Sequence, residues 1–170
     1  VLLMTGIGTT STQKQLFVSG YGEGKVEAVS GHQPTELTKF LSLIKQNPDT
    51  PVVLYSYAGQ YSPEVAQAMG DKSKLFVIEP WVGNSSRLQK AIDTIALGVP
   101  STNFQIAKGF FGNGSRGDGI PGASLTPSGV DHSPALTYAG TIIRSKFPPS
   151  PPPPKKLPIT GNVFEVVTTG

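Results

Sequence analysis

The sequence predicts an α/β domain with a mostly parallel central sheet and helices on both of its faces. Short apolar runs at residues 1–5, 51–55 and 74–78 indicate buried strands. Segments with helical spacing lie between these runs, and they supply the crossover connections that parallel strands need. The length of 170 residues fits one domain.

The first half of the chain gives the clearest elements. Residues 1–5 predict a strand that stops at a Gly-Ile-Gly turn, and residues 16–19 predict a second short strand. Apolar residues of 34–46 recur at i, i+3, i+4 and i+7, which predicts an amphipathic helix that ends before Pro48. The run 51–55 is apolar on both faces, as in a central parallel strand.

The second half continues the alternation. Ser62, Pro63 and Glu64 form a typical helix start, with a capping hydroxyl, a proline and an acid in the first turn. We expect that helix to end at Gly70, a strand at 74–78 and a third helix from residue 84 or 85. A further strand is expected at 103–107, a long loop at 109–127 and a last helix at 133–143.

The end of the chain has a different composition. Residues 147–158 are dominated by proline and predict an extended, semi-rigid linker. We therefore divide the chain into an α/β domain (1–146), this polyproline linker and a C-terminal extension (159–170). The extension contains a candidate docking strand, and it would attach the domain to protein partners.

Composition excludes several classes of function. The net charge of +3 includes four basic residues near the C-terminus, so no basic stripe suits nucleic acid. No apolar run reaches the length of a membrane-spanning helix, and no signal-peptide pattern opens the chain; a processed or partial chain is the expectation. With no cysteine, two histidines and no HExxH spacing, we expect no metal, and only half of a dinucleotide motif is present, so we expect no cofactor.

Three segments carry a resemblance to the α/β-hydrolase family of lipases and esterases. Residues 2–9, with Gly6 and Gly8, resemble the strand and oxyanion loop, although Thr5 stands where the family has His. Residues 52–59 resemble the nucleophile elbow, Gly-X-Ser-X-Gly, with Ser56 at the nucleophile position. The resemblance implies that backbone N–H groups near Ile7 and Tyr57 hold the oxyanion.

The third segment, residues 129–136, resembles the loop in which the family's catalytic His precedes the last helix. The resemblance implies that His132 takes the proton of Ser56. The acid that orients His132 would be Asp118 or Glu79, and either one follows the family's order of Ser, acid and His. The other histidine, His32, is expected to be a surface loop residue.

The function implied is therefore that of a small serine hydrolase acting on an ester or an amide through an acyl-enzyme. Two departures favour an alternative: Leu54 replaces a family glycine, and Pro63 indicates a helix that starts late after Ser56. The alternative is a catalytically silent α/β module that assembles through its tail in a virion or an extracellular complex. An extracellular or virion-associated location is slightly favoured over a cytoplasmic one.

Overall fold

A computed structural model describes residues 1–7, 10–80, 85–106, 121, 124–127 and 129–149. Its centre is a five-stranded parallel sheet in the order β2-β1-β3-β4-β5, with β3 in the middle. The strands are β1 (Leu2–Met4), β2 (Glu27–Val29), β3 (Val52–Tyr55), β4 (Leu75–Glu79) and β5 (Phe104–Ile106).

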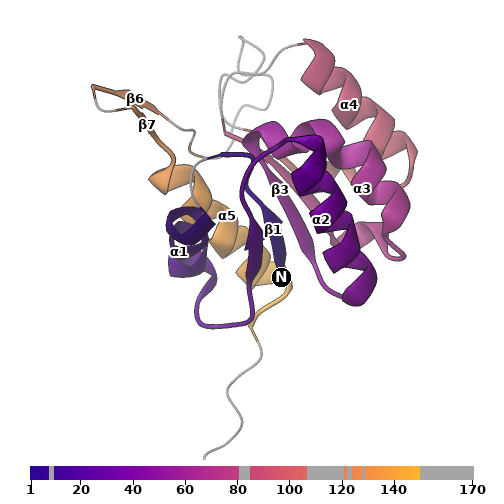
Figure 1. Ribbon diagram of the computed structural model, residues 1–170, viewed down its shortest axis with the longest axis horizontal. Helices are drawn as coiled ribbons and strands as arrows, with labels where there is room; N and C mark the ends of the chain where they lie inside the picture. The colour runs from indigo at the N-terminus through magenta and orange to yellow at the C-terminus, as the bar shows by residue number, and fades with distance from the viewer. Residues whose placement is uncertain (8–9, 81–84, 107–120, 122–123, 128, 150–170) are drawn as a thin grey trace, which may run out of the picture.

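Helices cover both faces of this sheet (Figure 1). On one face lie α1 (Thr10–Tyr21) and α5 (Ser133–Lys146); on the other lie α2 (Pro34–Gln46), α3 (Ser62–Ala68) and α4 (Ser85–Ala96). Short 3-10 helices stand at η1 (Ser56–Tyr61), η2 (Lys72–Lys74) and η3 (Ser101–Asn103). The expected three-layer α/β architecture is confirmed.

The side chains of the central strands alternate between the two faces of the sheet, and this alternation produces one hydrophobic core on each face. Successive side chains of a strand point to opposite faces, so β3 sends Val53 and Tyr55 toward α1 and α5, and Val52 and Leu54 toward the other helices. All four side chains are buried. Helices therefore cover β3 on both sides, and this is the reason predicted for the apolar character of residues 51–55 on both faces.

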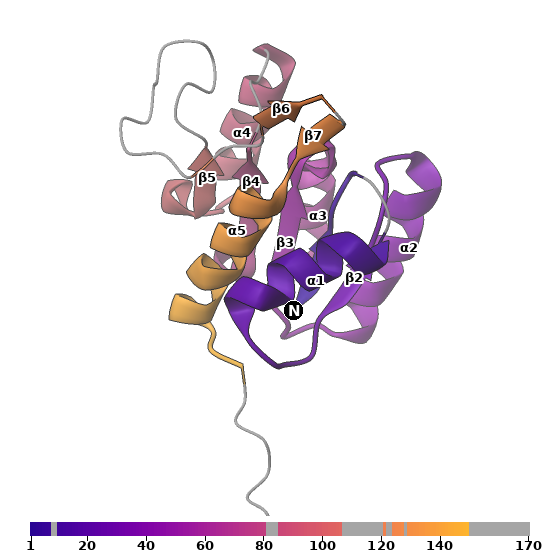
Figure 2. The same ribbon diagram turned by 90° about the vertical axis from the view of Figure 1, so that its left-hand side faces the viewer.

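The predicted strand at 16–19 is wrong, because these residues lie inside α1. Two glycines permit the close packing of α1 against α5, which run side by side in Figure 2. A Cβ at Gly20 would overlap the Thr137 carbonyl, and a Cβ at Gly140 would overlap the carbonyl oxygen of Phe17. Packing against α5 therefore makes residues 16–19 helical despite their strand-like composition.

Two short elements were not predicted. The edge strand β2 has only three residues, and two of them are at least partly exposed, so its sequence shows no clear alternation of apolar and polar residues. The antiparallel pair β6 (Ser124–Thr126) and β7 (Gly129–Asp131) lies just before α5, partly inside the predicted long loop.

Phe147, the first residue of the predicted linker, packs against the domain. Its ring packs edge-on against Phe76, with centroids 5.9 Å apart, and its carbonyl oxygen accepts a hydrogen bond from Tyr21 at 3.1 Å. Burial of this aromatic ring outweighs the extended character of the prolines that follow. The rest of the predicted linker and the extension 159–170 lie outside the described residues.

Candidate functional site

The carboxyl end of β3 carries a strained backbone conformation. The strand ends at Tyr55, and η1 begins at once with Ser56 and continues into α3. Among the non-glycine residues that the structure describes, Ser56 alone has a positive φ, of 60°. An L-residue pays about 1–2 kcal/mol for this left-handed conformation, so the surrounding structure must impose it.

This turn corrects one expectation about the helix after Ser56, the capping role of Ser62. The sequence predicted a start capped by Ser62, but the Ser62 hydroxyl instead meets the Thr94 hydroxyl at 2.7 Å, and it does not cap α3. Helical structure begins directly after β3, because the 3-10 turn η1 fills the gap before Pro63. The α-helix itself begins at Ser62, beside Pro63, as the sequence predicted. Leu54 is buried beneath the turn, on the α2 and α3 side of the sheet.

The loop after β1 lies directly against the Ser56 turn. Gly6 has a φ of 67°, and a Cβ there would collide with the backbone nitrogen of Ala58 and crowd that of Tyr57. The hydroxyls of Thr5 and Ser30 donate to the Ile7 carbonyl oxygen at 3.0 and 2.9 Å, which fixes the loop. Glycine at position 6 is thus required by close approach as well as by its backbone angle.

The sheet order explains why these two segments meet. The chain leaves β1 toward α1 on one face and leaves β3 toward α3 on the other, so β1 and β3 flank the switch point of the sheet. In open α/β sheets, ligands bind in the crevice at the carboxyl ends of the strands at this point. Gly6, Ile7 and Ser56 all lie at the carboxyl ends of β1 and β3, beside this switch point.

A nearly buried contact between Arg87 and Glu79 holds the other side of the turn. Arg87 of α4 donates from Nη1 to Glu79 Oε1 at 2.8 Å and to the Ser56 carbonyl oxygen at 2.7 Å. Its guanidinium carbon also lies 5.6 Å from the centre of the Tyr57 ring. Burial raises the pKa of Glu79 to about 8, although the charge and hydrogen bond of Arg87 act in the opposite direction.

His132 is the residue directly before α5, and it lies at the carboxyl end of β3. Its Nδ1 lies 2.8 Å from the hydroxyl of Tyr55, and the two rings meet edge-on with centroids 5.5 Å apart. Burial lowers the pKa of His132, and the neighbouring Asp131 opposes that change. The described hydrogen bonds of Ser56 and His132 do not join the two side chains to each other.

The second histidine, His32, was expected to be a surface residue, yet it is half-buried beside the turn. Its ring stands 5.1 Å from the ring of Tyr57, and its backbone carbonyl accepts a hydrogen bond from the Tyr61 hydroxyl at 2.7 Å. It lies three residues after β2, so the alignment of the carboxyl ends of the parallel strands brings it beside Tyr57. That topological rule is the signal that could have found it.

The acids proposed to orient His132 have different positions. Glu79 ends β4 at the correct edge, but its described partner is Arg87. Asp118 lies outside the described residues, so its role stays a prediction. Sequence reasoning did not identify Tyr55 or Arg87 as parts of this site, because the contacts of Tyr55 with His132 and of Arg87 with the Ser56 carbonyl join residues that are far apart in the chain.

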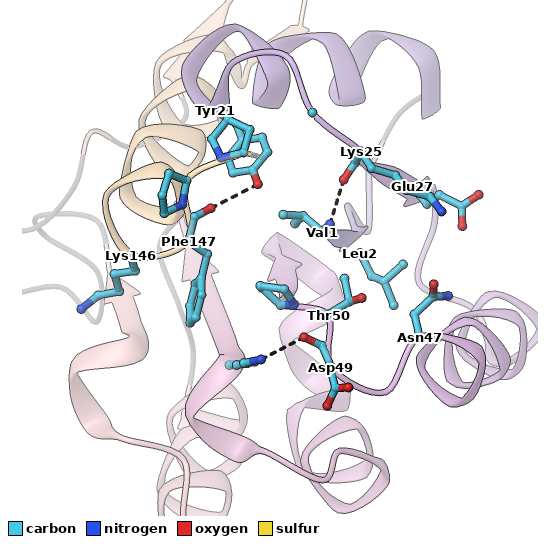
Figure 3. A pocket seen from close by; sticks show the side chains of 15 residues that line it. Val1, Leu2, Tyr21, Lys25, Glu27, Asn47, Asp49, Thr50, Lys146 and Phe147 are labelled. Carbon is cyan, nitrogen blue, oxygen red and sulfur yellow. Dashed lines mark hydrogen bonds between the residues drawn. The ribbon is translucent and has the colours of Figure 1, made fainter. Parts of the chain in front are cut away.

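A separate cavity of about 530 Å³ opens at the opposite, amino-terminal edge of the sheet (Figure 3). Lys25, Lys74 and Lys146 line it together with Glu27 and Asp49. Lys74 donates to the Asp49 carbonyl oxygen at 2.9 Å. The charges of the two signs are mixed, and the cavity is remote from the strained turn.

The part of the chain that the structure describes contains no group of three or more acidic or histidine side chains able to hold a metal ion. None of its helices combines the length and the apolar character needed to cross a membrane. No protein-family model, curated protein or solved structure matches the chain. The resemblance to α/β-hydrolases therefore stays a prediction from the residues.

Proposed function

We propose that the chain is a serine hydrolase that cleaves an ester or an amide through an acyl-enzyme formed on Ser56. The observation that carries this proposal is the φ of 60° at Ser56, at the carboxyl end of the middle strand. Strained non-glycine residues cluster at active sites, and the nucleophile elbow of α/β-hydrolases holds its serine in a strained strand-to-helix turn.

The elements around Ser56 support the remaining roles. The first N–H groups of a helix have no intrahelical acceptor, so the start of η1 offers donors for an oxyanion near Tyr57. The loop at Gly6 and Ile7 lies against the same backbone and would complete the oxyanion hole. Arg87 ties the Ser56 carbonyl to Glu79 and so helps to maintain the turn.

The proposed reaction has two halves. Ser56 Oγ attacks the carbonyl carbon while His132 takes its proton, and the imidazolium then protonates the leaving alcohol or amine. Water, deprotonated by His132, attacks the acyl-enzyme; the acid is released as the imidazolium returns its proton to Ser56 Oγ. Burial keeps the pKa of His132 below its usual value, so the imidazole is neutral and able to act as a base near pH 7.

The test is covalent labelling by a fluorophosphonate probe, which reacts with activated serines. We expect the intact chain to be labelled, and Ser56→Ala to abolish labelling. Ser42→Ala, at an exposed site on α2, is the matched control and should leave labelling unchanged. A folded, unlabelled protein would refute the proposal, as would labelling that survives Ser56→Ala.

A second candidate function is a silent assembly module, and the surface of α4 favours it. Leu88, Ile92 and Ile95 follow one another at helical spacing and are 41%, 50% and 38% exposed. Apolar side chains grouped in this way often mark a protein interface. An unlabelled sample whose self-association is lost on Ile92→Lys would favour this second function.

A further inference from the structure

We propose that the Tyr55 hydroxyl orients His132 for catalysis, in the position that a carboxylate occupies in a Ser-His-Asp triad. In such a triad the acid accepts a hydrogen bond from Nδ1–H and thereby fixes the imidazole tautomer with Nε2 free to take a proton. Here the hydroxyl oxygen of Tyr55 lies 2.8 Å from His132 Nδ1. The inference rests on the proposed function, because it gives Tyr55 a role in proton transfer from Ser56.

The geometry of Tyr55 suits a positioning residue. Its side chain is fully buried, and its ring is fixed in the core that also contains Phe76 and Leu136. Tyr55 is the residue directly before Ser56, so one short piece of backbone places both the nucleophile and the group that holds its base. A buried aromatic ring loses little freedom on holding a partner, because it is already immobile.

Two acids that would compete with Tyr55 for this role, Glu79 and Asp131, already have other partners, and this supports the assignment. Glu79 Oε1 is already engaged by the Arg87 guanidinium. Asp131, the neighbour of His132, accepts a hydrogen bond from the Ser133 N–H at 2.9 Å. In the described part of the chain, therefore, Tyr55 is the group that His132 Nδ1 contacts within hydrogen-bond distance.

Protonation of the two groups is consistent with this role. Burial, reinforced by the negative charge of Asp131, raises the pKa of Tyr55, so the hydroxyl stays neutral across physiological pH and can donate to or accept from Nδ1 according to the His132 tautomer. When His132 takes the Ser56 proton on Nε2, Nδ1–H continues to donate to the Tyr55 oxygen, and no proton moves to tyrosine. A neutral oxygen stabilises the imidazolium less than a carboxylate does, so we expect a slow hydrolase.

The first test measures the His132 tautomer directly. The chain contains two histidines, so long-range ¹H–¹⁵N spectra show two imidazole rings, and His32→Gln assigns them. We expect the Nδ1–H tautomer of His132 in the intact chain. In Tyr55→Phe, which keeps the buried ring and removes the hydroxyl, we expect a mixture dominated by Nε2–H. An Nε2–H tautomer in the intact chain overturns the inference, whatever the activity.

The second test is kinetic and uses p-nitrophenyl acetate. Tyr55→Phe should lower kcat about 10- to 100-fold with little change in KM, because one hydrogen bond to a charged group is lost. Asp118→Asn is the comparison variant, and it should change kcat less. If Asp118→Asn lowers kcat and changes the tautomer while Tyr55→Phe does neither, Asp118 orients His132 and the inference is refuted.

The outcomes separate this inference from the proposed function. If Ser56 is labelled but Tyr55→Phe leaves the His132 tautomer unchanged, the role of Tyr55 is refuted and the proposed function is not. Absence of labelling at Ser56 in the folded chain refutes the proposed function and the catalytic role of Tyr55 with it. Labelling together with the expected tautomer change and fall in kcat supports both.

Discussion

The strained backbone at Ser56 should destabilise the fold, and two substitutions at this position can measure the cost. Glycine accepts a φ of 60° without steric penalty, whereas alanine keeps the Cβ that causes it. Both substitutions remove the hydroxyl, which has no described hydrogen-bond partner. The difference between Ser56→Gly and Ser56→Ala therefore isolates the backbone strain from the loss of the side-chain oxygen.

The magnitude follows from two opposing contributions. Relief of the left-handed conformation gains about 1–2 kcal/mol. The greater freedom of glycine in the unfolded chain costs about 0.4–1 kcal/mol. We therefore expect Ser56→Gly to be more stable than Ser56→Ala by about 1 kcal/mol, which corresponds to about 2–4 °C in melting temperature for a domain of this size.

Urea titration of the two variants gives the free energy of unfolding, provided that their m values agree. The same pair at Ser42, in the exposed middle of α2, is the control. There the order should reverse, with glycine less stable than alanine by about 1 kcal/mol. If Ser56→Ala equals or exceeds Ser56→Gly in stability, the strained turn is absent and the main support for the nucleophile is lost.

Three further predictions concern the pH response and the packing. The folded pKa of Glu79, about 8, exceeds its unfolded value, so its contribution to stability is lost as pH rises from about 5 to 8. Wild type should lose up to about 1.4 kcal/mol per pH unit relative to Glu79→Gln in that window, and parallel pH profiles would contradict this. Gly140→Ala should cost about 2 kcal/mol through overlap with α1, while Gly70→Ala, which meets no atom within 4 Å, should be near neutral; equal effects would refute the close helix contact. Phe147→Ala should lower the free energy of unfolding by about 2 kcal/mol, whereas an unchanged value would return this residue to the linker.

Much of this fold could be predicted from local patterns in the sequence. The helix predicted at 34–46 coincides with α2, and the runs 51–55 and 74–78 contain β3 and most of β4. These elements are predictable because their apolar period and their capping signals agree. Residues 16–19 were assigned wrongly because the packing of α1 on α5 is invisible in a local window.

The candidate site was predictable only in part. Ser56 stands out in sequence because a polar residue follows an apolar strand and precedes small residues, and the structure adds the positive φ. The contact of Tyr55 with His132 depends on how α5 packs against the end of β3, and the contact of Arg87 with Glu79 depends on where α4 begins after β4. Sequence order alone does not fix that arrangement, so neither pair could be derived from spacing.

The close contact between α1 and α5 has a consequence for how the chain folds during synthesis. The first helix leaves the ribosome early, but the surface that receives it is made almost at the end of the domain. Until Lys146 has emerged, Leu3, Tyr55 and Ile78 lack the cover of α5 on their side of the sheet. A nascent chain stopped before Ser133 would present this apolar face to chaperones, so the domain completes its folding late and as one unit.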